Sequence, residues 1–167
     1  MANRDNHYEA AFEEYLRSRH VPYVAVDESR RSLLPDSSLK SLDFIVSTTR
    51  GVSWLVDVKG RRFPSGRQKQ YWKNWSTRDD LTSLRQWERL FGEPFGALFV
   101  FAYNIVGDRA PLPVDRLFEY GGGLYGFVAI RMTDYALHAR PISPAWDTVA
   151  MPVLNFRELA APFEHFL

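Results

Sequence analysis

Three charged side chains interrupt two apolar runs in the middle of the sequence. The stretch SLDFIVSTTRGVSWLVDVKG, residues 41–60, places Asp43, Asp57 and Lys59 among Leu, Ile, Val, Phe and Trp residues. Successive side chains of a strand point to opposite faces, so Asp57 and Lys59 share one face and the valine between them takes the other. Carboxylates and an amine held together in this way can support acid–base or metal-assisted chemistry.

The two apolar runs are predicted to form a hairpin, because TTRG between them is a turn sequence. If the chain turns about Arg50, the residue numbers of cross-strand partners add up to 100, which places Asp43 opposite Asp57. The same alternation puts Leu42 on the face of Phe44. Opposed carboxylates repel each other, and a divalent cation bound by their oxygen atoms would offset this repulsion. A solvated surface hairpin is the alternative, but strands this apolar are usually covered on both faces.

A helix is predicted over residues 7–19, where the apolar residues are spaced to form one stripe. At about 100° per residue, Glu9 lies nearest to this stripe, Glu13 is intermediate and Glu14 should be solvated. Glu9 is therefore placed where its carboxylate could reach a site on the sheet. The alternative for Glu9 is a salt bridge at the boundary of the packed face.

The remaining pattern predicts an α/β fold with a mixed sheet flanked by helices. The expected elements are a strand over 21–26, a polar loop over 27–38, strands over 42–47 and 53–59, a helix over 79–92, strands over 95–107, 124–130 and 135–141, and a short helix near 154–167. We interpret residues 1–167 as a single domain. Its core would span about 7–104, followed by a C-terminal β/α extension over about 105–167.

Positive charge is concentrated directly after the second apolar run. The formal net charge of the chain is +1, yet residues 59–78 hold seven basic residues and no acidic one. Such asymmetry indicates a polyanionic partner, with phosphate contacts expected from five residues: Arg61, Arg62, Arg67, Lys69 and Lys73. Aromatic residues are interleaved with these cations and could stack on unpaired bases: Phe63, Tyr71, Trp72 and Trp75. Alternatively, one or two of these tryptophans are buried in the core.

Composition excludes several classes of protein. The sequence contains no cysteine, so disulfides and thiolate metal sites are excluded and an intracellular, cytoplasmic location is favoured. The four histidines lie far apart, which argues against a zinc site. The first residues are polar, with no apolar segment typical of a signal peptide, and no run reaches the ~20 apolar residues of a membrane helix.

The order of these residues resembles the PD-(D/E)xK nuclease superfamily, the restriction-endonuclease-like proteins, and in particular the Holliday-junction resolvases. The matching positions are Glu9 in HYEAAFE, Asp43 in SLDFIV, and Asp57 and Lys59 in VDVKG. HYEAAFE is also similar to an uncharacterised family named for the pattern HYExAFE. Leu42 stands where the superfamily name has proline. The resemblance covers roughly residues 7–104.

This resemblance implies a magnesium-dependent endonuclease acting on DNA, with manganese able to substitute. The metal would be held by Asp43, Asp57 and the carbonyl of Val58, with Glu9 acting through the water shell. Lys59 would orient or help to deprotonate the attacking water. Selectivity for nucleic-acid structure and a homodimer are left open. The alternatives are an inactive nucleic-acid-binding module of the same fold and a structural or protein-interaction domain. Gln86 resembles glutamines of some such nucleases, but its helical position favours solvent.

Overall fold

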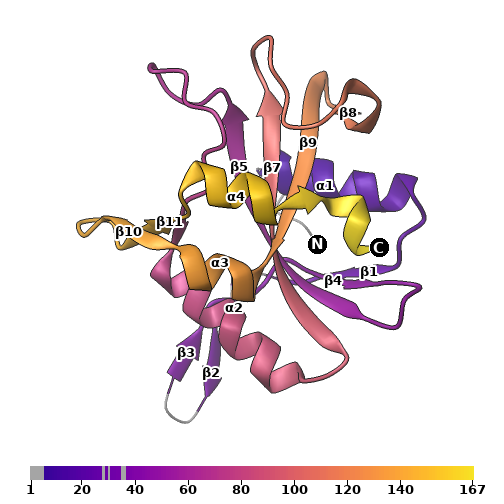
Figure 1. Cartoon of the computed structure of the whole chain (residues 1–167). Helices are drawn as coiled ribbons and strands as arrows, with labels where there is room; N and C mark the ends of the chain where they lie inside the picture. The colour runs from indigo at the N-terminus through magenta and orange to yellow at the C-terminus, as the bar shows by residue number, and fades with distance from the viewer. Residues whose placement is uncertain (1–5, 28, 30, 35–36) are drawn as a thin grey trace.

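The computed structural model describes residues 6–27, 29, 31–34 and 37–167. Its centre is a seven-stranded sheet in the order β1-β4-β5-β7-β9-β12, with β8 also paired to β9 (Figure 1). The strands β5 and β7 are parallel and the other pairs are antiparallel, so the sheet is mixed. Its strands are β1 (Tyr23–Ala25), β4 (Phe44–Ser47), β5 (Ser53–Phe63), β7 (Phe95–Ile105), β8 (Phe118–Tyr120), β9 (Gly123–Arg131) and β12 (Ala161–Pro162).

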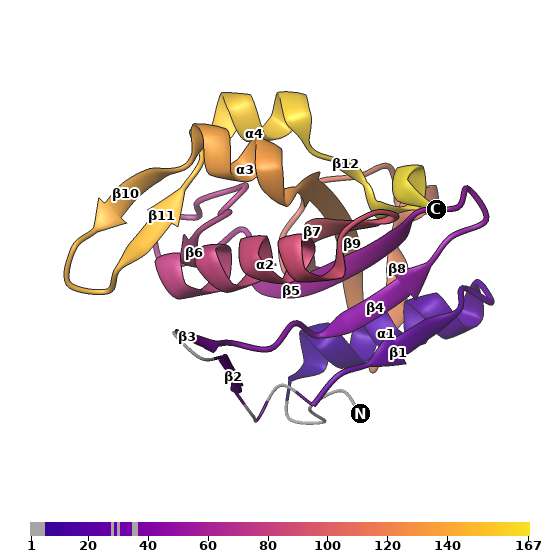
Figure 2. The ribbon, with the colours of Figure 1, turned by 90° about the horizontal axis from the view of Figure 1, so that it is seen from below.

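Helices cover both faces of this sheet. Figure 2 shows α1 (His7–Ser18) on one side, and α2 (Arg78–Phe91), α3 (Met132–His138) and α4 (Val153–Leu159) on the other. Each face packs its own apolar cluster, one around Phe12 of α1 and the other around Leu84 of α2. The predicted α/β fold, a mixed sheet flanked by helices, is confirmed. Among the described residues, no helix has the length and apolar character needed to cross a membrane.

The strand β5 contributes to both clusters because its side chains alternate. Trp54, Val56 and Val58 pack in the α1 cluster, whereas Leu55 and Phe63 pack in the α2 cluster. A strand covered on both faces is apolar along nearly its whole length. Asp57 and Lys59 share the parity of Leu55, so they lie on the α2 side of the sheet.

The predicted register of the central hairpin is confirmed. Phe44 pairs with Val56 and Ser47 with Ser53, so partner numbers add up to 100. One detail was wrong, because Leu42 packs in the α2 cluster whereas Phe44 packs in the α1 cluster. The reason is that β4 begins only at Phe44, and strand alternation does not extend back to Leu42.

The C-terminal third joins the central sheet through β9, which pairs with β7 from Leu98 to Asn104. The strand predicted over 135–141 is wrong over most of its length, since residues 132–138 form α3 and only residues from Arg140 onward form a strand. Helix formation there follows from burial of Met132 and Tyr135, which lie one helical turn apart. The predicted C-terminal helix is confirmed as α4, followed by β12 and a short 3-10 helix, η2 (Phe163–Phe166).

The segment predicted as a loop over 27–38 instead contributes a small hairpin, β2 (Ser32–Leu34) with β3 (Ser37–Leu39). Residues 28, 30, 35 and 36 of that segment lie outside the described residues. A second small sheet has the order β10-β11-β6, in which β11 joins a C-terminal hairpin to the entrance of α2. Its strands are β6 (Ser76–Thr77), β10 (Arg140–Ser143) and β11 (Thr148–Ala150). Elsewhere in the chain, a 3-10 helix, η1 (Val114–Arg116), precedes β8.

Candidate active site

A cleft of about 600 Å³ lies where the first turns of α1 and α2 meet the middle of β5. It is lined by the start of α1, by residues of the 40–43 and 57–61 segments, and by Trp75, Thr77 and Asp80. The structure thus brings together all the residues proposed for chemistry, which are Glu9, Asp43, Asp57, Val58 and Lys59. We refer to it as the catalytic cleft, after the chemistry proposed for these residues.

The edge of β5 is exposed to the catalytic cleft because β4 stops pairing with it at this point. The last contacts are a hydrogen bond from the Asp43 amide to the Val56 carbonyl, 2.9 Å, and one from the Val58 amide to Asp43 Oδ2, 2.6 Å. The amide and carbonyl of one strand residue face the same neighbouring strand. The carbonyl of Val58 therefore points to the same edge as its amide, toward Asp43.

Lys59 is shared between two buried carboxylates. Its Nζ lies 2.8 Å from Asp57 Oδ1 and 2.9 Å from Asp80 Oδ2. Only 11% of the Lys59 side chain is exposed, with 9% for Asp57 and 4% for Asp80. Asp80 also pairs with Lys40. Two lysines and two aspartates therefore form one ion cluster beside the exposed edge of β5.

The charges in this cluster shift one another's pKa values. Burial raises the pKa of Asp57; Lys59 opposes this rise and the charge of Asp80 adds to it. Burial alone would lower the pKa of Lys59, but Asp57 and Asp80 outweigh it and raise that pKa. Burial also favours the neutral form of Asp80, yet Lys59 and Lys40 hold its pKa well below the ordinary value. The two aspartates therefore favour the protonated form of Lys59.

Asp80 was missed by the sequence analysis, although a signal was present. Thr77 is the N-cap of α2, its side chain accepts from the Asp80 amide, and the Asp80 carboxylate accepts from the Thr77 amide. This reciprocal capping box follows from the pattern Thr-x-x-Asp before an apolar run. The pattern identifies a helix start, but the contact with Lys59 depends on how α2 packs against β5.

Glu9 lies on the opposite side of the catalytic cleft, in the first turn of α1. It is 4% exposed and accepts a hydrogen bond from the side chain of Asn6, the N-cap of that helix. The predicted order of burial is confirmed, since the Glu13 side chain is 14% exposed and that of Glu14 is 47% exposed. Glu13 is not among the cleft-lining residues and instead accepts from the Tyr23 hydroxyl.

The first turn of α1 approaches β5 closely because residue 60 is glycine. A Cβ at Gly60 would lie 2.1 Å from the ring of Tyr8, so no other residue fits there without displacing that ring. Gln86, on α2, does not line the catalytic cleft. The first turn of α1 carries Glu9 and the first turn of α2 carries Asp80, and the two lie on either side of the edge of β5.

The donor set of the catalytic cleft suits a hard divalent cation. Within the described part of the chain, no three His, Cys, Asp or Glu side chains gather as a metal site. A cation here would instead be held by the Asp43 and Asp57 carboxylates, the Val58 carbonyl and water. Magnesium is typically bound by one or two carboxylates and keeps several water ligands, so these residues fit it.

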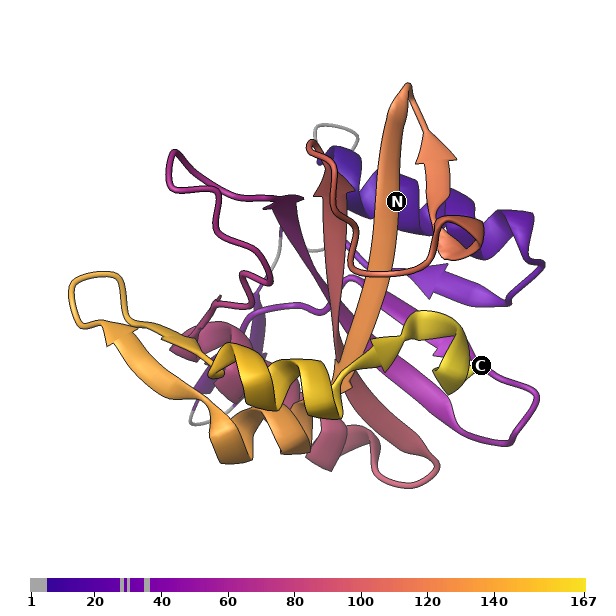
Figure 3. The same ribbon diagram turned by 45° about the horizontal axis from the view of Figure 1, so that its top comes forward.

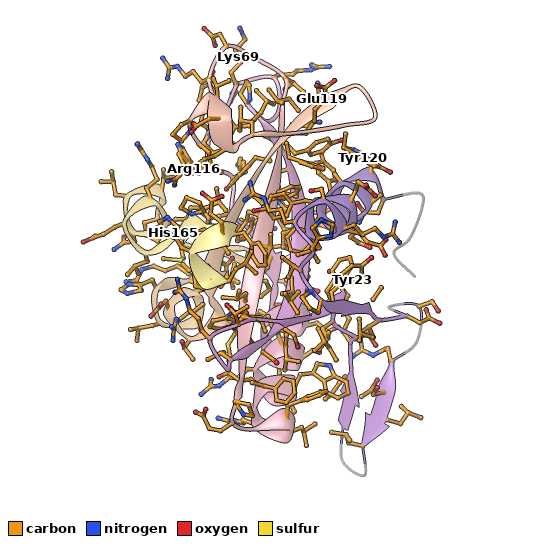
Figure 4. All side chains as sticks on the ribbon, turned by 90° about the vertical axis from the view of Figure 1, so that its right-hand side faces the viewer. Tyr23, Lys69, Arg116, Glu119, Tyr120 and His165 are labelled. Carbon is orange, nitrogen blue, oxygen red and sulfur yellow. The ribbon has the colours of Figure 1, made fainter. Side chains whose placement is uncertain are left out.

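The basic stretch divides into buried and exposed cations. Arg61 lines the catalytic cleft, where its guanidinium lies 3.8 Å from the centre of the Trp75 ring and donates to the carbonyls of Gly60 and Trp75. Burial lowers the pKa of Arg61. Arg62, Arg67 and Lys69 are exposed. Figure 4 shows Lys69 at the end of the molecule that lies at the top of that view.

Three of the four aromatic residues of this stretch pack in or against the core. The alternative, in which one or two tryptophans are buried there, therefore applies in part to Trp72. Phe63 is 1% exposed and packs edge-on against Tyr71 and Trp72, which are partly buried in the α2 cluster. Trp75 is the exception at 37% exposed. Stacking on bases by Phe63 was a wrong prediction, because β5 continues through Phe63 into the core.

Comparisons with known proteins add little. No protein-family model matches the chain, so the similarity to the HYExAFE pattern stays a prediction. No curated protein matches it either. Among solved structures, the Holliday junction resolvase Hjc of the archaeal hyperthermophile Archaeoglobus fulgidus aligns over 71% of this chain and 84% of its own, with 18% identity and a TM-score of 0.39. Such a score is too low to support a functional assignment.

Proposed function

We propose that the chain is a divalent-metal-dependent nuclease that hydrolyses phosphodiester bonds in DNA. One observation supports this above all others. Two carboxylates, a backbone carbonyl and a buried lysine converge on the exposed edge of β5, in a cleft of about 600 Å³. The exposed cations that follow along the chain would supply contacts to the phosphate backbone.

The oxygen ligands in the catalytic cleft have distinct roles in this proposal. Asp43 and Asp57 would bind the cation directly, together with the Val58 carbonyl, and Glu9 would hold its water ligands. When bound, magnesium or manganese neutralises charge developing on the phosphate and lowers the pKa of a water ligand. The hydrogen bond from the Val58 amide orients the Asp43 carboxylate, so this one ligand is held in place before a cation binds.

Lys59 would act as a positioned positive charge. Asp57 and Asp80 raise its pKa against the effect of burial, which favours its protonated form. Because two of its three N–H groups are directed to Asp57 and Asp80, the ammonium group would donate its remaining hydrogen bond to the attacking water or to a phosphate oxygen. A preorganised charge of this kind typically contributes about 10²–10³ in rate. The paired arrangement supports the orienting and electrostatic roles of Lys59, and its help in deprotonating the attacking water stays a prediction.

Asp80 would be a positioning residue. It accepts from Lys59 and from the α2 N-terminus, so it ties the lysine to a rigid helix end. Asp80 and Asp57 approach Lys59 from α2 and β5, respectively, and together they limit the positions its ammonium group can take.

The proposal is tested with the isosteric variants Asp43→Asn and Asp57→Asn. Thermal unfolding is followed with increasing manganese, and relaxation of supercoiled plasmid is followed in the same buffer. The parent should gain stability with manganese and nick the plasmid, whereas each variant should lose most of both effects, because a cation loses one of its two carboxylate ligands. Asp115→Asn, an exposed acid of η1, is the matched control and should behave as the parent does.

Two outcomes would count against a nuclease. A manganese response that persists in both variants would place the metal elsewhere. A parent protein that binds manganese and DNA but leaves supercoiled, branched and single-stranded DNA intact would support the binding-module alternative.

A further inference from the structure

A second cavity, of about 610 Å³, lies next to the catalytic cleft on the α4 side of the molecule. Its walls are the 70–75 segment, Ile142 of β10, the end of β11 with Met151, and Val153 of α4. Figure 3 shows the β10–β11 hairpin and the chain that follows β5 on the same side of the molecule. We call it the aromatic cavity, since Tyr71, Trp72 and Trp75 contribute to its wall.

The wall formed by residues 72–75 is rigid, although it has no regular secondary structure. Four successive carbonyl groups each accept a hydrogen bond from a side chain. The donors are the Asn74 amide to Trp72 (3.2 Å), the Tyr103 hydroxyl to Lys73 (3.0 Å), the Tyr135 hydroxyl to Asn74 (2.7 Å) and the Arg61 guanidinium to Trp75. Both tyrosines are fully buried. These four hydrogen bonds restrain the segment, so this wall of the aromatic cavity is preorganised.

The same segment is fixed to the opposite wall. The Asn74 side chain accepts from the Met151 amide at 2.8 Å and donates to the Met151 carbonyl at 3.2 Å. In addition, Trp72 adopts a left-handed backbone conformation, with φ of 60°. For a bulky residue this conformation is strained, and such strain is found at ligand sites held by their surroundings.

Trp75 separates the aromatic cavity from the catalytic cleft, because it lines both. Arg61 covers one face of its indole ring at 3.8 Å and lines only the catalytic cleft. Because Arg61 does not line the aromatic cavity, we take the opposite face of the ring as the one that a ligand there would contact. A tryptophan that is 37% exposed and held by a stacked arginine offers a flat, fixed platform.

The charge around the aromatic cavity suits a ligand with phosphate groups. Its lining includes Lys73 and no acidic residue. Two further cations lie against its aromatic residues, Arg157 at 5.1 Å from the Trp72 ring and Arg109 at 5.1 Å from the Tyr71 ring. The volume is within the ~300–1,000 Å³ range of pockets that take small organic ligands. A flat π-surface beside phosphate-binding cations is the usual site for an unpaired base.

We infer that the aromatic cavity binds one unpaired nucleotide of a nucleic-acid strand that continues into the catalytic cleft. The base would stack on Trp75, and its phosphate would face Lys73. This inference rests on the proposed function and adds the substrate class, which is nucleic acid with an unpaired nucleotide beside the cleaved bond, such as a single strand, a flap or a branch point.

The test measures binding and not cleavage. A short fluorescein-labelled oligothymidylate and a blunt duplex of equal length are titrated in EDTA, with fluorescence anisotropy as the readout. Trp75→Leu removes the stacking platform. Ala150→Phe fills the aromatic cavity from β11 without touching the catalytic cleft. Trp146→Leu, which changes a 79%-exposed tryptophan outside both cavities, is the matched control.

Both test variants should bind the single strand about tenfold more weakly or worse, since one stacked base is lost. Ala150→Phe should bind duplex within about twofold of the parent, because phosphate contacts outside the cavity persist. Thermal unfolding establishes whether each variant is folded. If Trp75→Leu does not fold, the result for Ala150→Phe alone decides the test.

The inference is overturned if folded Ala150→Phe binds the single strand as the parent does. It is also overturned if this variant loses single-strand and duplex binding equally, which would indicate a general cationic surface, or if the parent binds neither probe. Because the titration needs no metal, these results are independent of whether the protein cleaves DNA. Failure of the proposed function would show only in the manganese and plasmid assays.

Discussion

Replacement of Lys59 by methionine is the sharpest perturbation of the ion cluster. Methionine keeps most of the apolar stem and removes the charge, so the change isolates the ammonium group. From the sequence alone the fold of this variant is expected to survive, because its alkyl part can still pack. The structure adds a loss of stability, since Lys59 is the shared partner of Asp57 and Asp80, both buried.

The cost can be worked from the two distances. At 2.8 and 2.9 Å and an effective dielectric constant of ~20, each ion pair contributes on the order of 6 kcal/mol of Coulomb attraction. Desolvation of the buried charges offsets much of this. Breaking a buried pair by removing one partner typically costs about 3–5 kcal/mol. For a chain of this size that corresponds to a fall of roughly 6–20 °C in Tm.

Thermal unfolding at pH 7 with and without manganese measures the effect. Lys59→Met should melt well below the parent in EDTA and gain more from manganese, because the bound cation replaces the missing positive charge near Asp57. Cleavage of plasmid should fall by about 10²–10³ even when manganese saturates the protein. The double variant Lys59→Met with Asp57→Asn, measured in EDTA, is the control. It should recover part of the lost stability because the carboxylate left without its lysine is gone, whereas Asp80 keeps Lys40.

Two results would refute this reasoning. A Lys59→Met variant that melts within about 2 °C of the parent in EDTA would mean that the two ion pairs contribute no net stability. A variant that cleaves at the parent rate would remove Lys59 from the proposed mechanism altogether.

Two further predictions concern Asp80 and the exposed cations. Because the pKa of folded Asp80 lies below its unfolded value of about 3.9, its stabilising contribution is complete above that pH and is lost as pH falls through the folded pKa. The difference in Tm between the parent and Asp80→Asn should therefore be constant from about pH 7 to 5 and shrink below about pH 4. Thermal unfolding across this range measures it, and a difference that does not change with pH would contradict the assignment. Replacing Arg62 and Lys69 together by serine should flatten the dependence of log duplex affinity on log salt by up to about 2, at about 0.9 per phosphate contact. Arg89→Ser, an exposed change on α2, should leave that slope as it is, and an unchanged slope in the double variant would place the nucleic-acid surface elsewhere.

The sequence by itself determined the local geometry of the candidate site. Strand alternation and the TTRG turn were enough to predict the register that pairs Phe44 with Val56, and to put Asp57 and Lys59 on one face. Helical periodicity likewise predicted that Glu9 is the most buried of three glutamates in α1. These features depend on a few consecutive residues and on fixed backbone periods of two and 3.6, which a sequence displays directly.

Tertiary structure alone decided which side chains meet across elements. Asp80 contacts Lys59 only because α2 packs its first turn on β5, and Arg61 stacks on Trp75 only because the chain after β5 folds back. The segment around Tyr135 is likewise helical because of packing between distant elements. This packing places the Tyr135 hydroxyl where it donates to the Asn74 carbonyl of the 72–75 segment. A periodic pattern specifies the face on which a residue lies, but its neighbours there depend on contacts between residues distant in the chain.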